Sequence, residues 1–172
     1  AKCKTCRRAG EKLFLKGERC FTPKCAVARK PYPPGIHGRT ARRSSSEYAM
    51  QLREKQKLRF FYQVGEQQLK NYTRAATQLQ GGDAGEYLLR QLERRLDNVV
   101  FQAGFAQSRS VARQMVTHGH ILVNKRKLAV PSYAVVTGDV ITLSAKALAS
   151  MQANNLDNAP KKYTPPGWLI FD

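Results

Sequence analysis

Negative charge is scarce in this sequence. Its 172 residues include 12 Asp and Glu against 30 Lys and Arg, which gives a formal net charge of +18. The imbalance is greatest in the first 62 residues, where 17 basic residues face 4 acidic ones. An excess of this size indicates a polyanionic partner. The few carboxylates lie close to arginines in the sequence, and we interpret them as ion-pair partners rather than as catalytic acids or bases.

Long hydrophobic runs are also missing. No apolar stretch approaches the roughly 20 residues that a bilayer-spanning helix needs, and no signal peptide opens the chain. The sequence contains neither a phosphate-binding loop of the form Gly-x-x-x-x-Gly-Lys nor a nucleophile elbow. We therefore predict that the protein is not an enzyme and has no membrane partner and no small-molecule substrate.

Cysteine is limited to four residues, and all of them lie within the first 25 positions. Cys3 and Cys6 form one closely spaced pair, and Cys20 and Cys25 form another. Two short knuckles of this kind can supply the tetrahedral set of four soft ligands that zinc prefers. We predict a structural Zn²⁺ site, with an iron–sulfur cluster, disulfides or four free thiols as the alternatives.

A stretch rich in proline and glycine follows, over residues 30–39. Proline and glycine disfavour both helices and strand pairing, so we predict an extended arm. Its cations suit phosphates, and Tyr32 or His37 can stack on exposed bases. A flexible surface linker is the alternative interpretation. We assign His37 to an RNA contact or a turn, because four cysteines already satisfy zinc.

Two amphipathic helices are predicted next, over residues 48–62 and 66–79. Ser44 and Glu47 have the spacing of a capping box for the first helix. Arg53 and Lys57 lie four residues apart and form either a ridge for phosphates or a solvated basic face. The side chains predicted to face inward are Tyr48, Leu52, Leu58, Phe61, Tyr62, Leu69, Tyr72, Ala76 and Leu79.

The central region reads as two helices followed by a pair of strands. Apolar residues from Leu89 to Ala103 recur at helical steps, with a capping box at Asp83 and Glu86 and a stop at Gly104. A shorter helix is predicted from Arg109 to His118, capped by Ser108 and ended by Gly119, with Val111, Met115 and Val116 inward. Extended runs follow at residues 121–123 and 140–143. A last helix is predicted over residues 144–157, with Leu148 and Met151 inward.

Basic residues cluster on the central unit. Arg109 and Arg113 lie four apart on one predicted helix face, and His118 and His120 flank the Gly119 turn. Such groups can neutralise the phosphates of a nucleic-acid backbone and release its counterions. The alternative for any single helix is a solvated basic surface.

Five short stretches stand out in order along this region: Arg95–Val100, Ser108–Gln114, His118–Asn124, Val130–Tyr133 and Gly138–Asp139. Together they resemble the RNA-binding module of the ribosomal protein S4 family. The four-cysteine spacing and the run from Leu15 to Cys20 resemble the zinc-bearing members of that family, and the Pro-Pro-Gly-x-His-Gly string also resembles the family. In the family the turn after Asn124 usually carries glycine. Lysine is disfavoured in a two-residue turn with two positive φ angles, so we expect another type of turn here.

The resemblance implies an α+β fold. It consists of a mainly helical N-terminal domain with a four-cysteine metal knuckle, and a small two-helix and β-hairpin RNA-binding module inserted in that domain. The expected parts are residues 1–43 (knuckle and basic arm), 44–93 (helical domain), 94–143 (the module) and 144–172 (a segment that returns to the helical domain).

The resemblance also implies a function. We expect a structural constituent of the small ribosomal subunit, located in the cytoplasm, which binds small-subunit rRNA, nucleates assembly of the subunit body and supports translational accuracy. The implied neighbours are other small-subunit proteins, S5 among them, and mRNA near its entry channel. The alternative is a free-standing RNA-binding or RNA-modification-associated factor that uses the same module.

The predicted sites form two groups. No catalytic residue is expected. The metal ligands are Cys3, Cys6, Cys20 and Cys25. The expected RNA-binding residues are Arg7, Arg8, Arg29, Lys30, Tyr32, His37, Arg39, Arg42, Arg43, Arg53, Lys55, Lys57, Arg59, Arg94, Arg95, Arg109, Arg113, His118, His120, Lys125, Arg126 and Lys127.

Overall fold

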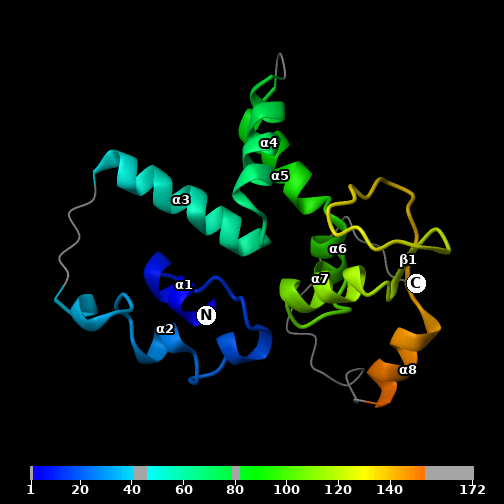
Figure 1. The fold of residues 1–172 in the computed structure, drawn as a ribbon, viewed down its shortest axis with the longest axis horizontal. Coiled ribbons are helices and arrows are strands. Elements are labelled where there is room, and N and C mark those ends of the chain that lie inside the picture. The colour runs from blue at the N-terminus through cyan, green and yellow to red at the C-terminus, as the bar shows by residue number, and fades with distance from the viewer. Residues whose placement is uncertain (1, 41–45, 79–81, 154–172) are drawn as a thin grey trace. The chain divides into compact units, whose positions relative to one another are not determined.

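The computed structural model describes residues 2–40, 46–78 and 82–153, and it divides into two compact units, Ala1–Ala75 and Ala76–Asp172 (Figure 1). Helices dominate, and the described residues contain one small antiparallel sheet. This composition confirms the α+β expectation at the level of fold class. In the described part of the chain, no helix combines the length and apolar character that a membrane crossing requires.

The first unit is helical. Helix α1 packs against α2 and α3 around a core of Cys6, Leu13 and Leu15, and Phe60 of α3 covers this core. One 3₁₀ turn, η2, lies inside the stretch predicted to be an extended arm, so that prediction is wrong at these residues. The elements are α1 (Lys2–Ala9), η1 (Gly17–Cys20), α2 (Ala26–Arg29), η2 (Ile36–Gly38), α3 (Glu47–Tyr62) and α4 (Glu66–Thr77).

Helix α3 begins one residue earlier than predicted. Its first turn is capped by Ser46, whose hydroxyl accepts a hydrogen bond of 3.3 Å from the Ala49 amide. The predicted cap, Ser44, lies outside the described residues. Tyr62 is buried as expected, but Tyr48 is 73% exposed. The contacts of α3 with the core come from its C-terminal half, so its first turns remain in solvent.

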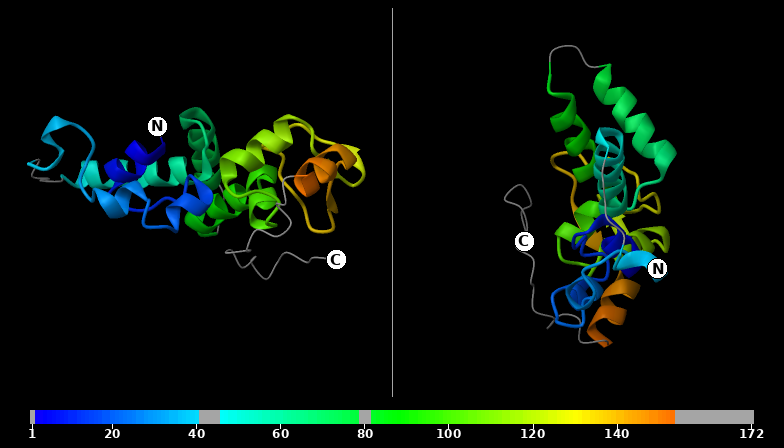
Figure 2. Two further views of the ribbon diagram at one scale, coloured as in Figure 1. Left: turned by 90° about the horizontal axis from the view of Figure 1, so that it is seen from below. Right: turned by 90° about the vertical axis from the view of Figure 1, so that its left-hand side faces the viewer.

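The second unit combines helices with a three-stranded sheet. Strand β1 lies in the middle, with Val123 paired to Arg126 of β2 on one side and to Ile141 of β3 on the other. Helices α6 and α7 pack side by side (Figure 1 and Figure 2). The elements are α5 (Ala84–Glu93), α6 (Leu96–Gln102), α7 (Arg109–Thr117), β1 (Ile121–Val123), β2 (Arg126–Lys127), β3 (Ile141–Leu143) and α8 (Ala145–Ala153).

Six fully or nearly fully buried residues form the core of this unit. Because side chains alternate along a strand, Ile121 and Val123 both point to the helices, and they meet apolar residues from α6 and α7. Val116 is buried as predicted, whereas Val111 is 42% exposed and Leu89 is 47% exposed, contrary to prediction. The core residues are Leu96, Val100, Ala112, Val116, Ile121 and Val123.

The long helix predicted from Asp83 to Gly104 is two helices. Asp83 does cap the first, through a 2.8 Å hydrogen bond from the Gly85 amide, but Glu86 pairs with Arg90 and does not complete a capping box. The break occurs at Arg94 and Arg95, where Arg95 is extended and forms a β-bridge with Ala134. A segment remote in sequence thus supplies the hydrogen bonds that end α5 and start α6.

The β1–β2 turn differs from the expectation. Asn124 has φ = 50° and Lys125 has φ = 65°, which are the two positive angles of a two-residue type I′ hairpin turn. Two residues just before β3 hold Asn124 in place. Its side chain donates a hydrogen bond to Asp139 at 2.8 Å and accepts one from the Val140 amide at 2.9 Å. These contacts fix the turn despite the lysine.

Helix α8 occupies the first part of the predicted C-terminal helix. The Ser144 hydroxyl accepts a 3.3 Å hydrogen bond from the Ala147 amide, and Ala147 is buried. Leu148 is 46% exposed and not inward as predicted, because Ala147 occupies the buried position. The expected packing of Met151 and the expected return of residues 154–172 to the helical domain lie outside the described side chains and residues.

Candidate nucleic-acid interface

Arg95 and Asp97 form a buried ion pair at the start of α6. The Arg95 guanidinium donates to both carboxylate oxygens, at 3.0 Å from Nε and 2.8 Å from Nη2. The Arg95 side chain is 1% exposed and that of Asp97 is 5% exposed. Burial therefore contradicts the predicted surface role of Arg95. The sequence interpretation of Asp97 as the partner of an arginine is confirmed.

Arg109 and Arg113 are half-buried on α7, and residues of α6 restrain both. Arg113 Nη1 lies 3.6 Å from Asp97 Oδ2, and the side chain remains 42% exposed. Arg109 Nε donates to Asn98 Oδ1 at 2.8 Å, and its guanidinium lies 4.6 Å from the Phe101 ring centroid. Each arginine is thus held in place by its neighbours, which favours recognition of a fixed arrangement of phosphates.

A polar network behind α7 escaped the sequence analysis. Asn98 Nδ2 donates to the Glu93 carboxylate at 2.7 Å, and Gln102 donates to the same oxygen. Asn98 and Gln102 are 2% and 5% exposed. Gln102 is therefore a buried polar residue and not a surface position. The sequence carried one signal of this network, because Asp97, Asn98 and Gln102 are polar residues within an otherwise apolar short helix.

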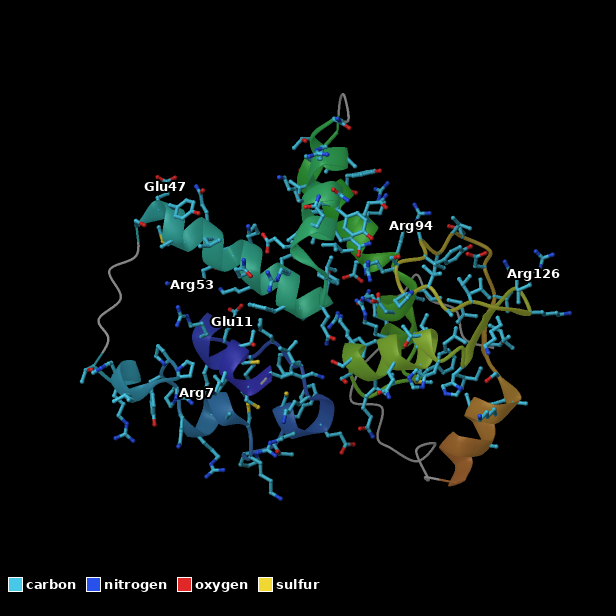
Figure 3. All side chains as sticks on the ribbon, in the orientation of Figure 1. Arg7, Glu11, Glu47, Arg53, Arg94 and Arg126 are labelled. Carbon is cyan, nitrogen blue, oxygen red and sulfur yellow. The ribbon has the colours of Figure 1, made fainter. Side chains whose placement is uncertain are left out.

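The β1–β2 hairpin lies beside the turn at Gly119, which His118 and His120 flank. Lys125, Arg126 and Lys127 are exposed, and Arg126 extends outward from the hairpin (Figure 3). The Lys127 side chain crosses Gly119 so closely that a Cβ at that glycine would collide with Lys127 Cε. Since the His118 and His120 rings lie 6.0 Å apart on either side of Gly119, the structure places Lys127 beside the histidine pair.

Arg94 contributes to the fold. Its Nε donates to the Val135 carbonyl at 2.9 Å, and its own carbonyl accepts from the Val135 amide at 2.8 Å. Arg94 is half-buried. The side chain therefore helps to attach residues 131–135 to the break between α5 and α6.

The four cysteines line one small cavity in the first unit. None of the four forms a disulfide, and three of them, Cys6, Cys20 and Cys25, are buried. The Lys16 amide donates to Cys20 Sγ at 3.4 Å, which is the kind of contact that supports a thiolate ligand. As the side chains stand, no group of three or more His, Cys, Asp or Glu in the described residues is arranged to hold a metal ion. The donor set suits zinc, and the side-chain positions fall short of a formed site.

Two of these thiols have shifted pKa values. Burial raises the pKa of the Cys6 thiol, and the nearby cysteines add to the rise, while the Leu13 amide opposes it. Burial also acts to raise the pKa of Cys25. There the amides of Ala28 and Val27, together with nearby cations, outweigh burial and lower the pKa.

The arm over residues 30–39 is anchored to α1. Arg7 donates to the carbonyls of Tyr32 and Pro33 at 3.0 and 3.1 Å, and Arg7 and Arg39 both lie within about 5 Å of the Tyr32 ring centroid. Hydrogen bonding to Arg39 lowers the pKa of Tyr32. Gly38 packs so closely on the Pro33 carbonyl that a side chain would not fit. These contacts contradict a flexible linker for this stretch.

The predicted basic residues of the arm differ in their surroundings. Arg7 is half-buried, and Arg8, Arg29, Lys30, His37 and Arg39 are exposed. The His37 carbonyl accepts hydrogen bonds from Thr40, in keeping with the turn role considered for this residue. Arg42 and Arg43 lie outside the described residues.

Three of the four cations predicted on α3 bind carboxylates. Lys55 and Arg59 contact the two Glu66 oxygens at 2.5 and 2.7 Å. Lys57 contacts Glu54 at 2.8 Å and Glu11 at 3.2 Å, and Glu11 faces α3 in Figure 3. Hydrogen bonds from Lys55 and Arg59 lower the pKa of Glu66 to about 2. Arg53 is half-buried on the same helix.

Comparison with known proteins adds a second line of evidence. Residues 1–93 match the model of the ribosomal protein S4/S9 N-terminal domain, and residues 94–141 match the S4 domain. The small ribosomal subunit protein uS4 of Syntrophomonas wolfei is 49% identical over 170 residues, which span 99% of this chain and 81% of the relative. The uS4 protein of Halothermothrix orenii is 52% identical over 167 residues, 97% of this chain and 79% of the relative. That of Natranaerobius thermophilus is 51% identical over 170 residues, 99% of this chain and 81% of the relative.

Proposed function

Because this chain belongs to the ribosomal protein S4 family, we propose that it grips small-subunit rRNA through arginines fixed on α7 and cations exposed on the β1–β2 hairpin. The chain is a structural protein of the small ribosomal subunit, binds rRNA and is not an enzyme.

The observation that carries the proposed interface is the pair Arg109 and Arg113. They lie on one face of α7, and each is restrained by a residue of α6, which reduces the conformational entropy lost on binding. Folded RNA presents phosphates and 2′-hydroxyls more readily than base edges. We therefore assign these arginines to backbone recognition, together with Lys125, Arg126 and Lys127.

The other predicted contacts are kept as proposals, except where the structure gives the side chain a role inside the fold. Arg95 is not kept as a proposed RNA contact, because its side chain is buried. Arg94 and Arg7 act mainly in holding the chain together. The residues retained as proposed RNA contacts outside α7 and the hairpin are Arg8, Arg29, Lys30, Tyr32, His37, Arg39, Arg42, Arg43, Arg53, Lys55, Lys57, Arg59, His118 and His120.

Zn²⁺ is the metal proposed for the cysteine cavity. Cys3, Cys6, Cys20 and Cys25 line the same cavity, and four thiolates are a ligand set typical of closed structural zinc sites. An iron–sulfur cluster accepts the same ligands and remains the alternative. In either case the metal would stabilise the first unit and would have no catalytic role.

Wider roles follow from the resemblance to the family. We propose that the protein binds rRNA early and nucleates assembly of the subunit body, in the cytoplasm. We also propose that it contacts S5 and supports decoding accuracy near the mRNA entry channel. The free-standing RNA factor is not favoured, because the uS4 relatives match almost the whole chain.

Binding to a full-length small-subunit rRNA transcript tests the proposal. The purified full chain should prefer this transcript to a random acidic polymer of equal charge. A plot of log Kd against log salt concentration should rise with a slope of several units, because several phosphates are neutralised. Sedimentation adds a second criterion, because a ribosomal protein stays with small subunits after a moderate salt wash and a loosely bound factor is released. Equal affinity for the two polymers would refute the proposal.

A further inference from the structure

Two phenylalanine rings stack on the surface of the cysteine-bearing segment. The ring centroids of Phe14 and Phe21 lie 5.0 Å apart with an angle of 29° between the ring planes. Phe14 is 38% exposed and Phe21 is 53% exposed, so a large part of each residue stays open to solvent in the described chain. Neither residue has a role in the interface described above.

Phe14 is held in an unfavourable backbone conformation. Its φ of 49° lies in the left-handed region, which costs a non-glycine residue about 1–2 kcal/mol. The flanking Leu13 and Leu15 are both buried in the core around Cys6. The backbone therefore accepts strain in a conformation that leaves the Phe14 ring at the surface. Strain of this kind at an exposed aromatic residue points to a binding role.

The segment around the ring pair is mainly basic. Lys12, Lys16, Arg19 and Lys24 are all exposed and close to the two phenylalanines in sequence, against two exposed carboxylates, Glu11 and Glu18. Lysines are depleted from the centres of protein–protein interfaces. Exposed aromatic rings flanked by cations are instead typical of single-stranded nucleic-acid sites, where bases stack on the rings and the cations bind the backbone. The charge favours RNA over a protein partner.

We propose that Phe14 and Phe21 form a stacking platform for an unpaired nucleobase of the bound RNA, with the neighbouring cations on the adjacent phosphates. The inference rests on the proposed rRNA-binding function and adds a base contact to an interface otherwise assigned to backbone phosphates. Phe21, the more exposed ring, presents the stacking surface, and Phe14 supports it from behind.

The test compares a single-stranded adenine oligonucleotide with an abasic phosphodiester of the same length and charge. The full chain, with its native metal content, should bind the base-bearing strand more tightly. Phe21→Leu should weaken that binding about tenfold, which is within the range for loss of one base–aromatic stack. It should leave the abasic strand unaffected, and Phe21→Tyr should retain wild-type affinity.

Two controls separate stacking from other effects. Tyr48→Leu removes an exposed ring from α3, for which no ring partner is found in the described residues, and should leave the preference for bases intact. On the small-subunit rRNA transcript, Phe21→Leu should lower affinity without changing the salt slope, because no charge is removed. Circular dichroism at rising temperature confirms that each variant is folded.

Three outcomes for Phe21→Leu would contradict the stacking platform. The first is an unchanged preference for the base-bearing strand, and the second is an equal loss of affinity for the abasic strand. The third is normal binding to RNA alone combined with weaker incorporation of the variant into small subunits when other subunit proteins are present. The last outcome would identify the ring pair as a protein contact. None of them requires the wild type to lose its preference for rRNA over an acidic polymer, so failure of the platform and failure of the proposed function are distinguishable.

Discussion

The Arg95 guanidinium and the Asp97 carboxylate meet through two hydrogen bonds of 3.0 and 2.8 Å inside the second unit. Arg113 Nη1 approaches Asp97 Oδ2, the oxygen that also accepts from Arg95 Nη2, at a distance of 3.6 Å. Asp97 therefore links a buried cation, which maintains the fold, to a half-exposed cation proposed to bind RNA. Substitutions at the two arginines should have separable effects.

Arg95→Ala should destabilise the second unit by about 3–5 kcal/mol, because the Asp97 carboxylate would remain buried without its main partner. Urea unfolding monitored by circular dichroism measures the effect. Arg113→Ala is the matched control, since its ion pair with Asp97 is half-exposed and should contribute about 1 kcal/mol or less. Equal stability of wild type and Arg95→Ala would contradict the structural role of the buried pair.

Arg113→Ala should weaken rRNA binding and reduce the salt slope by about 1, as expected for the loss of one phosphate contact. Filter binding over a series of salt concentrations gives both quantities. Arg90→Ala provides the comparison, because Arg90 is exposed, pairs with Glu86 and is not a proposed RNA contact. A fall in helix content that matched the fall in affinity would show that Arg113 acts through the fold.

Cys6→Ser should release the metal and loosen residues 1–40 while the second unit keeps its protection against hydrogen exchange. Elemental analysis and hydrogen–deuterium exchange measure the two effects. Thr5→Ser, a neighbouring substitution on α1, should change neither. If the metal content of Cys6→Ser equalled that of the wild type, the proposed site would be wrong.

Glu66 should make the stability of the first unit depend on pH. Its folded pKa of about 2 lies below the ordinary value of 4.5, so its ionised form favours folding. This contribution is fully present above about pH 4.5 and is lost as the pH falls towards 2.

The pH dependence can be measured by comparing the Tm of wild type and Glu66→Gln. The difference should be largest above pH 4.5, shrink towards pH 2 and weaken at high salt, because the pairs with Lys55 and Arg59 are partly exposed. Glu47→Gln, which removes a carboxylate bound only by Gln51 in the described contacts, should show no such trend. A constant Tm difference across this range would argue against the ion pairs.

Lys125→Gly should stabilise the β1–β2 turn and weaken RNA binding at the same time. Glycine removes the cost of the left-handed conformation, about 1–2 kcal/mol, less its own extra chain entropy of about 0.5–1 kcal/mol. Lys125→Ala is the control, because it removes the charge and keeps the strain. Urea midpoints should rise only for the glycine variant, whereas rRNA affinity should fall for both. A loss of stability in Lys125→Gly would contradict the strain assigned to this turn.

Local sequence patterns predicted the elements that are stabilised locally. The α7 helix ends where Gly119 takes φ = 69°, and β1 occupies the predicted residues Ile121–Val123. The four-residue spacing of Arg109 and Arg113 placed both on one face. These features depend on periodicity and on residues adjacent in the chain, so a single sequence contains the information needed to find them.

Features imposed by remote segments were not predicted. Leu92, Leu96 and Val99 fit one continuous helix, and only the docking of residues 131–135 breaks it and buries Arg95. Lysine in the β1–β2 turn is tolerated because Asp139 and Val140 hold Asn124. Helical spacing places Leu89 on the apolar face of its helix, but it does not tell whether another element covers that face.

The attachment of residues 131–135 to the break at Arg94 has a consequence for biosynthesis. The Arg94 and Val135 contact joins positions 41 residues apart, so it can form only after the later segment has left the exit tunnel of the translating ribosome. Until then, Arg95 and Asp97 remain hydrated, and no bridge fixes the direction in which α6 leaves α5. The path from α5 into α6, and with it the enclosure of the Arg95–Asp97 pair, is therefore completed late in synthesis, and a nascent chain that ends before Val135 lacks this attachment.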